Sequence, residues 1–140
     1  LIFFILIQIV MGAFVSGLDA GNIYQTWPMM GYSYFPNDIE LENFKNIFDF
    51  DNHSLVQFYH RNLAYLLFFY IVFISIYIFK NKITSLYQAV KFLIFFTFLQ
   101  IILGIFTLIS GVNIFLASSH QITSVLLILS ALNLYYLRAN

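Results

Sequence analysis

Two histidines are the residues of this chain best placed to do chemistry. His60 lies within residues 56–65 and His120 within residues 116–121, each about one helical turn after the start of a long apolar segment. An imidazole at such a depth needs a partner, because unpaired polar groups are costly inside a membrane. Histidine is also the commonest protein ligand for metals. Two histidines at matched depth therefore indicate a metal-centred group clamped between them.

The composition is that of an integral membrane protein. Hydrophobic residues make up 61% of the 140 residues and charged residues only 9%, against roughly 25% charged residues in soluble domains. Six basic residues balance six acidic ones, so the chain has no net charge to attract nucleic acid. It also has no cysteine, which excludes disulfides, thiolate metal sites and iron–sulfur clusters. A metal must therefore be held by histidine or carboxylate.

The apolar pattern predicts an all-α membrane protein in which four helices form an up-down transmembrane bundle. Their expected ranges are 1–17, 56–79, 88–110 and 115–137. The last three match the roughly 20 residues that cross a bilayer, whereas the first is shorter. We therefore expect the first helix to begin before residue 1, and we interpret the chain as the C-terminal half of a protein whose N-terminal half is missing.

The charges predict which way the bundle faces. Lys80, Lys82 and Lys91 lie around the connection between the second and third helices, and Arg138 follows the fourth. Basic residues gather on the cytoplasmic side of membrane proteins. The loop over residues 18–55, which holds all six acids, is therefore expected outside.

The outer loop carries its own signals. A capping-box pattern at Asn37, with apolar residues at helical spacing after it, predicts a short amphipathic helix over about 38–50. Tyr24 and Trp27 are aromatic residues suited either to a membrane-interface belt or to a lid over an amphiphilic ligand. Asp19 is either a functional acid or a solvated loop residue, and the sequence favours the second.

The chain repeats a helix pair. Gln8 and Gly12 in the first helix correspond to Gln100 and Gly104 in the third, and in each case the next helix carries a histidine near its start. Two copies of such a unit predict a pseudo-symmetric bundle with the histidines at equivalent positions. The glutamines lie near mid-membrane, where we expect them to form hydrogen bonds between helices.

A haem iron is the metal-centred group that best fits between the two histidines. One turn deeper than the histidines lie Ala64 and Ser124, both small enough to leave volume for a macrocycle. Each Nδ1 is expected to donate to the carbonyl one turn earlier, at Val56 or Leu116, so that Nε2 remains for the metal. Zinc is disfavoured because no carboxylate shares the depth of the histidines. The alternative is that each histidine only forms a hydrogen bond to a neighbouring helix.

Two further residues lie near the predicted clamp. Arg61 faces the outer interface, where it pairs with a haem propionate or extends its charge to lipid headgroups. His53, seven residues before His60, is assigned to the loop.

Specific motifs give the chain a family resemblance. Residues 8–30 read Gln-x-x-x-Gly-Ala-Phe-Val-x-Gly-x-Asp-Ala-Gly-x-x-Tyr-x-x-Trp-Pro-x-Met. Residues 57–65 read Gln-Phe-x-His-Arg-x-x-Ala-Tyr, and related motifs follow at 99–108 and 116–121. Together they cover nearly the whole chain and resemble the C-terminal half of haem A synthases. Those enzymes have eight helices in two related halves, and they oxidise the C8 methyl of haem O to the formyl of haem A.

The resemblance implies a role for this half. It would hold a haem b through His60 and His120, while the haem O site and the proposed catalytic glutamate would lie in the other half, so no catalytic residue is assigned here. The implied partners are lipid, the substrate haem O, a haem O synthase and an electron acceptor. A homo-oligomer is a second way to complete the site. The implied location is the bacterial inner membrane, with the mitochondrial inner membrane as the alternative.

Two other functions remain open from the sequence. A bis-histidine membrane cytochrome b that only carries electrons would share the bundle and both ligands, without needing a second half. A structural membrane subunit would use both histidines for hydrogen bonds alone, and would bind no haem. Bound haem and turnover of haem O are the observations that separate the three.

Overall fold

A computed structural model describes residues 1–39 and 47–139 of the chain. Within these ranges the long regular elements are all helices: α1 (Ile2–Gly17), α2 (His53–Lys80), α3 (Tyr87–Ile109) and α4 (Ile114–Ala139), with short 3₁₀ turns η1 (Ala20–Asn22) and η3 (Thr84–Leu86). The expected all-helical class is confirmed. The predicted amphipathic helix over about 38–50 lies largely outside the described residues.

Three segments are long and apolar enough to cross a membrane, namely His53–Lys80, Thr84–Ile109 and Ile114–Ala139. The helix α1 is also apolar but has 16 residues, fewer than the roughly 20 that span a bilayer. These lengths identify a membrane protein.

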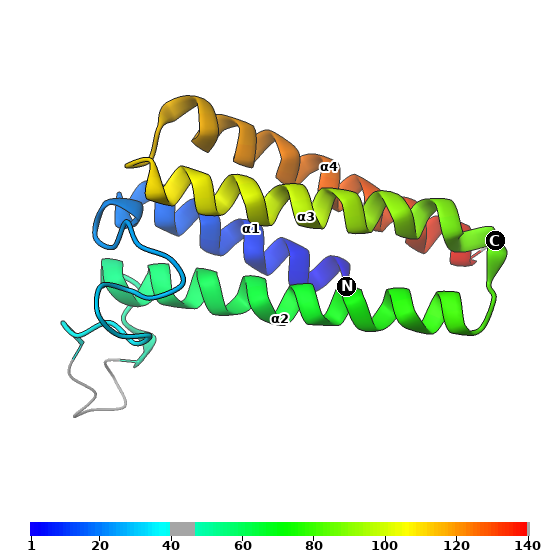
Figure 1. The fold of residues 1–140 in the computed structure, drawn as a ribbon, viewed down its shortest axis with the longest axis horizontal. Helices are drawn as coiled ribbons and strands as arrows, with labels where there is room; N and C mark the ends of the chain where they lie inside the picture. Colours follow the sequence, from blue (N-terminus) through cyan, green and yellow to red (C-terminus); the bar gives the residue numbers. More distant parts are fainter. Residues whose placement is uncertain (40–46, 140) are drawn as a thin grey trace.

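Successive helices run in opposite directions and lie side by side (Figure 1). The most extensive packing joins α3 to α4 and α1 to α2, and further packing joins α2 to α3 and α1 to α4. The outer loop and the turn before α4 lie at one end of the molecule, whereas the connection between α2 and α3 lies at the other.

The start of α2 corrects one prediction. Asn52 caps the helix, because its Oδ1 accepts from the backbone N–H of Leu55 at 3.0 Å. Since asparagine is a strong N-cap, the helix begins at His53 rather than near residue 56. His53 is therefore the exposed first residue of α2 and does not belong to the loop.

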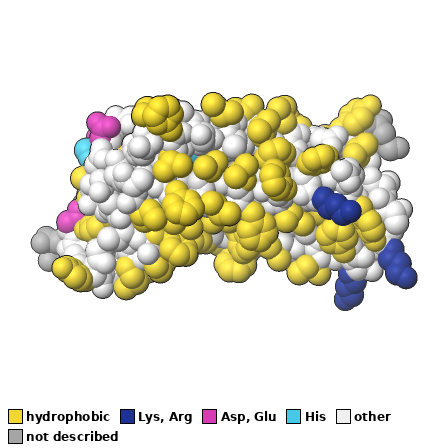
Figure 2. All heavy atoms as spheres, turned by 45° about the horizontal axis from the view of Figure 1, so that its top comes forward, with side chains coloured by type: hydrophobic (Ala, Val, Ile, Leu, Met, Phe, Trp, Pro, Cys, Tyr) yellow, Lys and Arg dark blue, Asp and Glu magenta, His cyan; other side chains and the backbone are white. Residues whose placement is uncertain are grey.

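The interior of the molecule changes from apolar to more polar along its length. The apolar core is made of side chains such as Ile71, Leu93 and Ala131, which gather away from the outer loop. The histidines and the glutamines lie nearer the loop. Much of the surface between the ends is apolar, and the basic side chains visible in Figure 2 lie at the end opposite the acids, whereas Arg61 lies at the loop end. This division places the polar cluster in the outer half of the helices.

Candidate functional site

The two histidines occupy corresponding places on α2 and α4. His60 lies two turns inside α2, and His120 lies nearly two turns inside α4. Neither ring is fully exposed. Since α2 and α4 each pack mainly against α1 and α3, the neighbours of each imidazole are set by those two helices.

Glycines make room for both imidazole rings. A Cβ added to Gly12 would lie 3.2 Å from Cε1 of His60, and one added to Gly104 would lie 3.0 Å from Cε1 of His120. By contrast, a Cβ on Gly17 would have no neighbour within 4 Å. Each ring therefore lies with its Cε1 edge on the backbone of the preceding helix.

The glutamines form the expected hydrogen bonds between helices. Gln8 Nε2 donates to the backbone carbonyl of His60 at 3.1 Å, and Gln100 Nε2 donates to that of His120 at 2.8 Å. The same type of bond thus joins α1 to α2 and α3 to α4. In each helix pair, a side chain from the first helix holds the backbone at the histidine of the second.

The ring nitrogens do not have the partners that we expected. Gln8 Nε2 lies 3.2 Å from Nδ1 of His60 and 3.4 Å from its Nε2. In the described part of the chain, Nδ1 of His120 is buried and has no partner, so the predicted bond to Leu116 is wrong. The physical reason is that each ring packs with Cε1 against a glycine of the preceding helix, and not against the previous turn of its own helix.

Arg61 fastens the outer loop to α2. Its guanidinium donates to the carbonyls of Tyr24 and Thr26, both at 2.9 Å, and of Met29 at 3.3 Å. These contacts with the loop were not predicted from the sequence. Nε of Arg61 is buried and has no partner among the residues described. Its role toward a cofactor stays a prediction.

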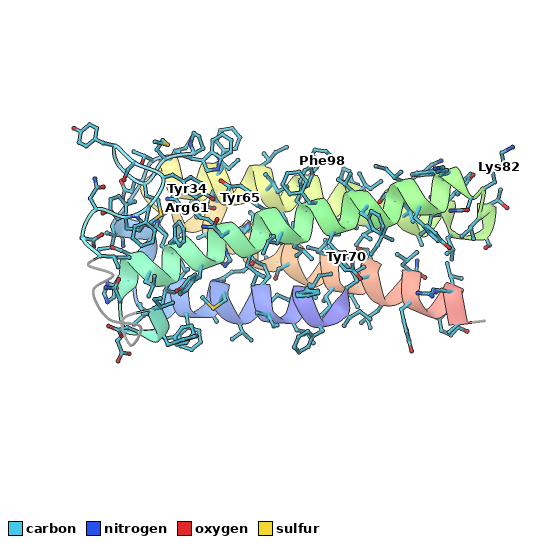
Figure 3. The ribbon with its side chains drawn as sticks, turned by 90° about the horizontal axis from the view of Figure 1, so that it is seen from below. Tyr34, Arg61, Tyr65, Tyr70, Lys82 and Phe98 are labelled. Atoms are coloured by element: carbon cyan, nitrogen blue, oxygen red, sulfur yellow. The ribbon has the colours of Figure 1, made fainter. Side chains whose placement is uncertain are left out.

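Aromatic residues complete the loop contact. Figure 3 shows Tyr34, Arg61 and Tyr65 together at the loop end of the molecule, far from Lys82. Trp27 Nε1 donates to the hydroxyl of Tyr65 at 3.1 Å, and the hydroxyl of Tyr34 donates to Asn62. These bonds place the loop directly on one face of α2.

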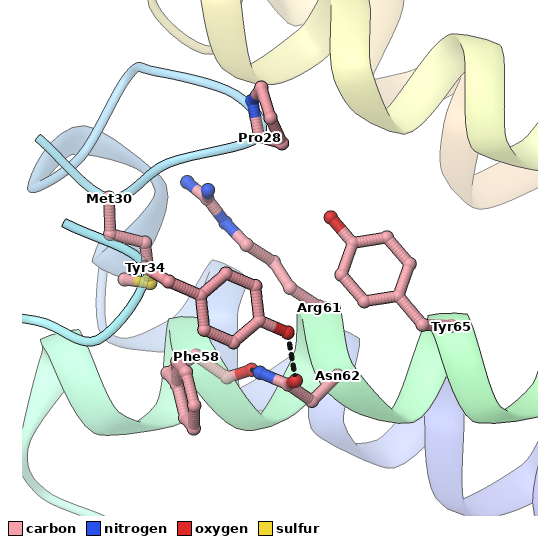
Figure 4. A pocket seen from close by; sticks show the side chains of 7 residues that line it. All are labelled: Pro28, Met30, Tyr34, Phe58, Arg61, Asn62 and Tyr65. Atoms are coloured by element: carbon pink, nitrogen blue, oxygen red, sulfur yellow. Dashed lines mark hydrogen bonds between the residues drawn. The ribbon is translucent and has the colours of Figure 1, made fainter.

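A small hollow remains between the loop and α2 (Figure 4). It encloses essentially no space for even a water molecule, whereas ligand pockets measure roughly 300–1,000 Å³. A macrocycle therefore has no room there. The hollow is lined by Pro28, Met30, Tyr34, Phe58, Arg61, Asn62 and Tyr65.

An acidic residue that we did not single out ties the loop to the start of α2. Asp38 accepts from the hydroxyl of Tyr24 at 2.8 Å and from that of Ser54 at 2.6 Å. Burial opposes ionisation of Asp38, but these two hydrogen bonds outweigh it and lower the pKa of the carboxyl. Burial, together with the bond to Asp38 and its charge, raises the pKa of Tyr24. No sequence motif marked this contact.

Asp19 lies apart from the histidines. It is exposed, has a left-handed φ of 52° and precedes η1, as suits the predicted solvated loop residue. Within residues 1–39 and 47–139, no three side chains of histidine or carboxylate type gather as a metal site.

Comparison with known proteins agrees with these features. The sequence profile of a family described as "Cytochrome oxidase assembly protein" matches residues 1–132. A haem A synthase of Pelagibacter ubique is 44% identical over 139 residues, which is 97% of this chain and 40% of that protein. The chain belongs to the haem A synthase family. It spans about two fifths of the length of that relative.

Other haem A synthases show a similar relation. The protein from Rickettsia felis is 37% identical over 89% of this chain and 36% of its own length. The protein from Bartonella tribocorum is 40% identical over 86% of this chain and 34% of its own length. No solved structure matches the chain.

Proposed function

We propose that this chain is the haem b-holding part of a haem A synthase, in which His60 and His120 would hold the haem iron. The observation that carries the proposal is the repeated arrangement of histidine, glutamine and glycine. In both helix pairs the ring lies on a glycine and the glutamine bonds to the histidine carbonyl. Family membership supports a role in haem A biosynthesis.

The residues present fit a haem. Nδ1 of His120 is buried without a partner among the described atoms. This supports a partner for the His120 ring that comes from outside the described chain. Each ring lies with Cε1, the carbon between its two nitrogens, against a glycine of the preceding helix, so both halves of the repeat present an imidazole in the same way. Together with the alternating directions of the helices, this pattern supports a pseudo-symmetric up-down bundle.

The chain's own residues would act by holding and orienting. When bound, a bis-histidine haem supplies reversible one-electron chemistry. Gln8 and Gln100 fix the turns of α2 and α4 that carry the ligands. Arg61 and Asp38 hold the outer loop over the same end of α2, where the loop limits the access of water.

The complete protein is proposed to be an oxidoreductase. Conversion of the C8 methyl of haem O to a formyl group, with water as the oxygen source, releases four electrons and four protons. An electron acceptor is therefore required, and a bacterial inner membrane supplies such acceptors. Haem O synthase is the proposed source of substrate, and the remaining part of the protein, or a second copy, would complete the site.

The ligand assignment is tested by absorption spectroscopy of detergent-purified protein, oxidised and reduced. We expect His60→Ala and His120→Ala to lose the sharp bands of low-spin haem, because each removes one ligand. His53→Ala is the matched control, since His53 is exposed at the start of α2. Full haem occupancy with unchanged bands in both of the first two variants would exclude the assignment.

An activity assay separates the haem A synthase function from the electron-carrier function. A full-length protein that contains this chain should convert haem O to haem A, as measured by pyridine haemochrome analysis. Bound haem without any such conversion would favour the bis-histidine electron carrier instead.

A further inference from the structure

The outer loop contacts both helix pairs, α1 with α2 and α3 with α4. Tyr24 fastens the loop to α2, because its carbonyl accepts from Gln57 Nε2 and from the Arg61 guanidinium, both at 2.9 Å. The loop also meets the turn between α3 and α4, which lies at the same end of the molecule (Figure 1). There, a Cβ added to Gly21 would lie 3.1 Å from Cγ2 of Val112. The loop therefore reaches from the first helix pair to the second.

A second contact lies beside the first. The side chain of Gln25 covers Gly111, whose added Cβ would lie 3.7 Å from both Nε2 and Oε1 of the glutamine. Gly21 is buried, and Gly111 has a left-handed φ of 70°, which favours glycine. Because neither position carries a side chain, the loop lies directly on the turn.

Val112 adopts an unfavourable backbone conformation at this contact. Its φ is 57°, in the left-handed region that β-branched residues rarely enter. The backbone alone would favour glycine at this position. Strained residues persist where the surrounding structure requires them, and the contact of the valine side chain with Gly21 supplies such a requirement.

The bridge lies at a different level from the apolar core. Core side chains such as Leu67 and Leu127 hold the helices together away from the outer loop, whereas the two histidines lie nearer the loop and on different helix pairs. Groups that share one bound cofactor must keep their geometry to within about 0.5 Å. A connection at the outer end adds a second fixed point beyond the core, so the helix pairs cannot spread apart where the histidines lie.

We propose that Val112 is a positioning residue that, through its contact with Gly21 in the outer loop, fixes the separation between the outer ends of the two helix pairs and so between His60 and His120. The consequence for the histidines as ligands rests on the proposed function. The bridge itself does not, because it can be measured in protein without haem.

The first test measures distances between spin labels by pulsed EPR in detergent-purified protein without haem. The chain has no cysteine, so labels at His53→Cys and Ser118→Cys, both at exposed positions, report the separation of α2 and α4 near the loop. Val112→Gly relaxes the backbone but removes the side chain, so this distance distribution should widen. Lys82→Gly is the matched control, because Lys82 also has a left-handed φ, of 52°, but is exposed at the opposite end. It should leave the distribution unchanged.

A second pair of labels, at Lys80→Cys and Arg138→Cys, reports the ends away from the loop. Val112→Gly should leave this distance unchanged, because the apolar core holds that part of the helices. Val112→Thr keeps a methyl group at Cγ2 and should restore the parent distribution near the loop. An outer distribution that Val112→Gly does not widen would overturn the proposal. So would equal widening at both ends, which indicates a general loss of packing.

A reciprocal change tests the contact itself. Gly21→Ala places a methyl group against Val112 and should lengthen the outer distance, whereas Gly17→Ala, with nothing within 4 Å of its added Cβ, should not. Val112→Ala removes Cγ2, so the double variant with Gly21→Ala should show the distance of Val112→Ala alone. Two sites that do not touch give additive effects, and additive changes here would contradict the contact.

Haem-loaded protein tests the consequence for the ligands. The EPR signal of a low-spin ferric haem reports how its two imidazoles are held, so Val112→Gly should broaden this signal and Lys82→Gly should not. An unchanged signal in Val112→Gly would refute the positioning role. If the parent protein binds no haem, the proposed function fails, while the distances in haem-free protein still decide whether the bridge exists.

Discussion

Arg61 both attaches the outer loop to α2 and keeps a positive charge there. Three loop carbonyls converge on its guanidinium, and hydrogen bonds that involve a charged donor are each worth about 1.5–3 kcal/mol. The carbonyls accept hydrogen bonds from the guanidinium without neutralising its positive charge, so Arg61 still attracts an anion. The bonds to Tyr24 and Met29 therefore hold the loop on α2 and leave a positive site at the outer end of the helix.

The carboxylate of Asp38 makes the attachment of the loop depend on pH. Its pKa is lowered in the folded protein, because the hydrogen bonds from Ser54 and Tyr24 outweigh the burial that opposes ionisation. The carboxylate therefore stabilises the loop above the usual value of 3.8, and that stabilisation is lost as the pH falls through the folded pKa. Tyr24 has a raised pKa, so its contribution is lost only as the pH rises beyond the usual 10.0.

Trp27 provides the measurement. It is the single tryptophan of the chain and lies in the loop, where it donates to Tyr65. Its fluorescence should stay constant over the neutral range and move to longer wavelength in acid. Asp38→Asn should produce that change already at neutral pH, whereas Asp51→Asn, at an exposed acid before α2, should not. Identical acid transitions in all three proteins would contradict this account.

At the scale of helices, the glycines decide how closely each pair packs at its histidine. Alanine usually stabilises a helix relative to glycine by about 0.5–1 kcal/mol. At Gly104 and Gly12 the new Cβ would meet an imidazole carbon at 3.0 and 3.2 Å, tighter than ordinary contact. The ring must then move, together with the hydrogen bonds around it. The local gain in helix propensity is outweighed if the ring cannot move freely.

We therefore expect Gly104→Ala and Gly12→Ala to lower the thermal unfolding midpoint in detergent and to alter the low-spin spectrum of bound haem. The effect should be larger at Gly104, where the approach is closer. Gly17→Ala is the matched control in the same helix as Gly12, because nothing lies within 4 Å of its added Cβ. A loss of stability at Gly17 equal to that at Gly12 would show that the imidazole contact is not the cause.

The helices could be predicted from the sequence more fully than their contacts. Hydropathy gave α3 and α4 to within a residue or two at most ends, because a membrane imposes length and apolarity directly. The earlier start of α2 was readable in principle, since Asn52 is a strong capping residue. The glutamine bonds between helices followed from the cost of an unpaired amide in lipid. The His120 ring could not be placed, because its orientation depends on packing against Gly104.

The contacts of the outer loop could not be predicted from the sequence. Arg61 and Asp38 find their partners only because the loop over residues 18–39 folds back onto α2, and no periodic pattern encodes such a path. The contact of Gln100 Nε2 with the Thr123 hydroxyl, at 3.0 Å, was overlooked for a related reason. A hydroxyl inside a helix usually bonds to its own preceding turn, so its bond with a glutamine of another helix appears only once α3 and α4 are packed together.

At the scale of the whole molecule, polarity is arranged along the membrane normal. The apolar core fills the part away from the loop, and the paired histidines and glutamines lie nearer the loop. The basic side chains visible in Figure 2 lie at the far end, whereas Arg61 lies at the loop end. A group clamped by the histidines would thus lie nearer the outer face, close to Arg61. On the orientation predicted from the charges, the apolar core would separate it from the cytoplasmic side.

This arrangement predicts an orientation that can be measured directly. The chain has no cysteine, so single cysteines can be introduced as unambiguous probes. Tyr32 is 99% exposed in the outer loop, and Ser85 is exposed in η3 at the opposite end. Because basic residues stay on the cytoplasmic side, Tyr32→Cys should react with a membrane-impermeant maleimide in intact cells. Ser85→Cys should react only after the membrane is opened. The reverse pattern would place the histidines near the cytoplasmic face and overturn the assigned orientation, while leaving their ligand role untouched.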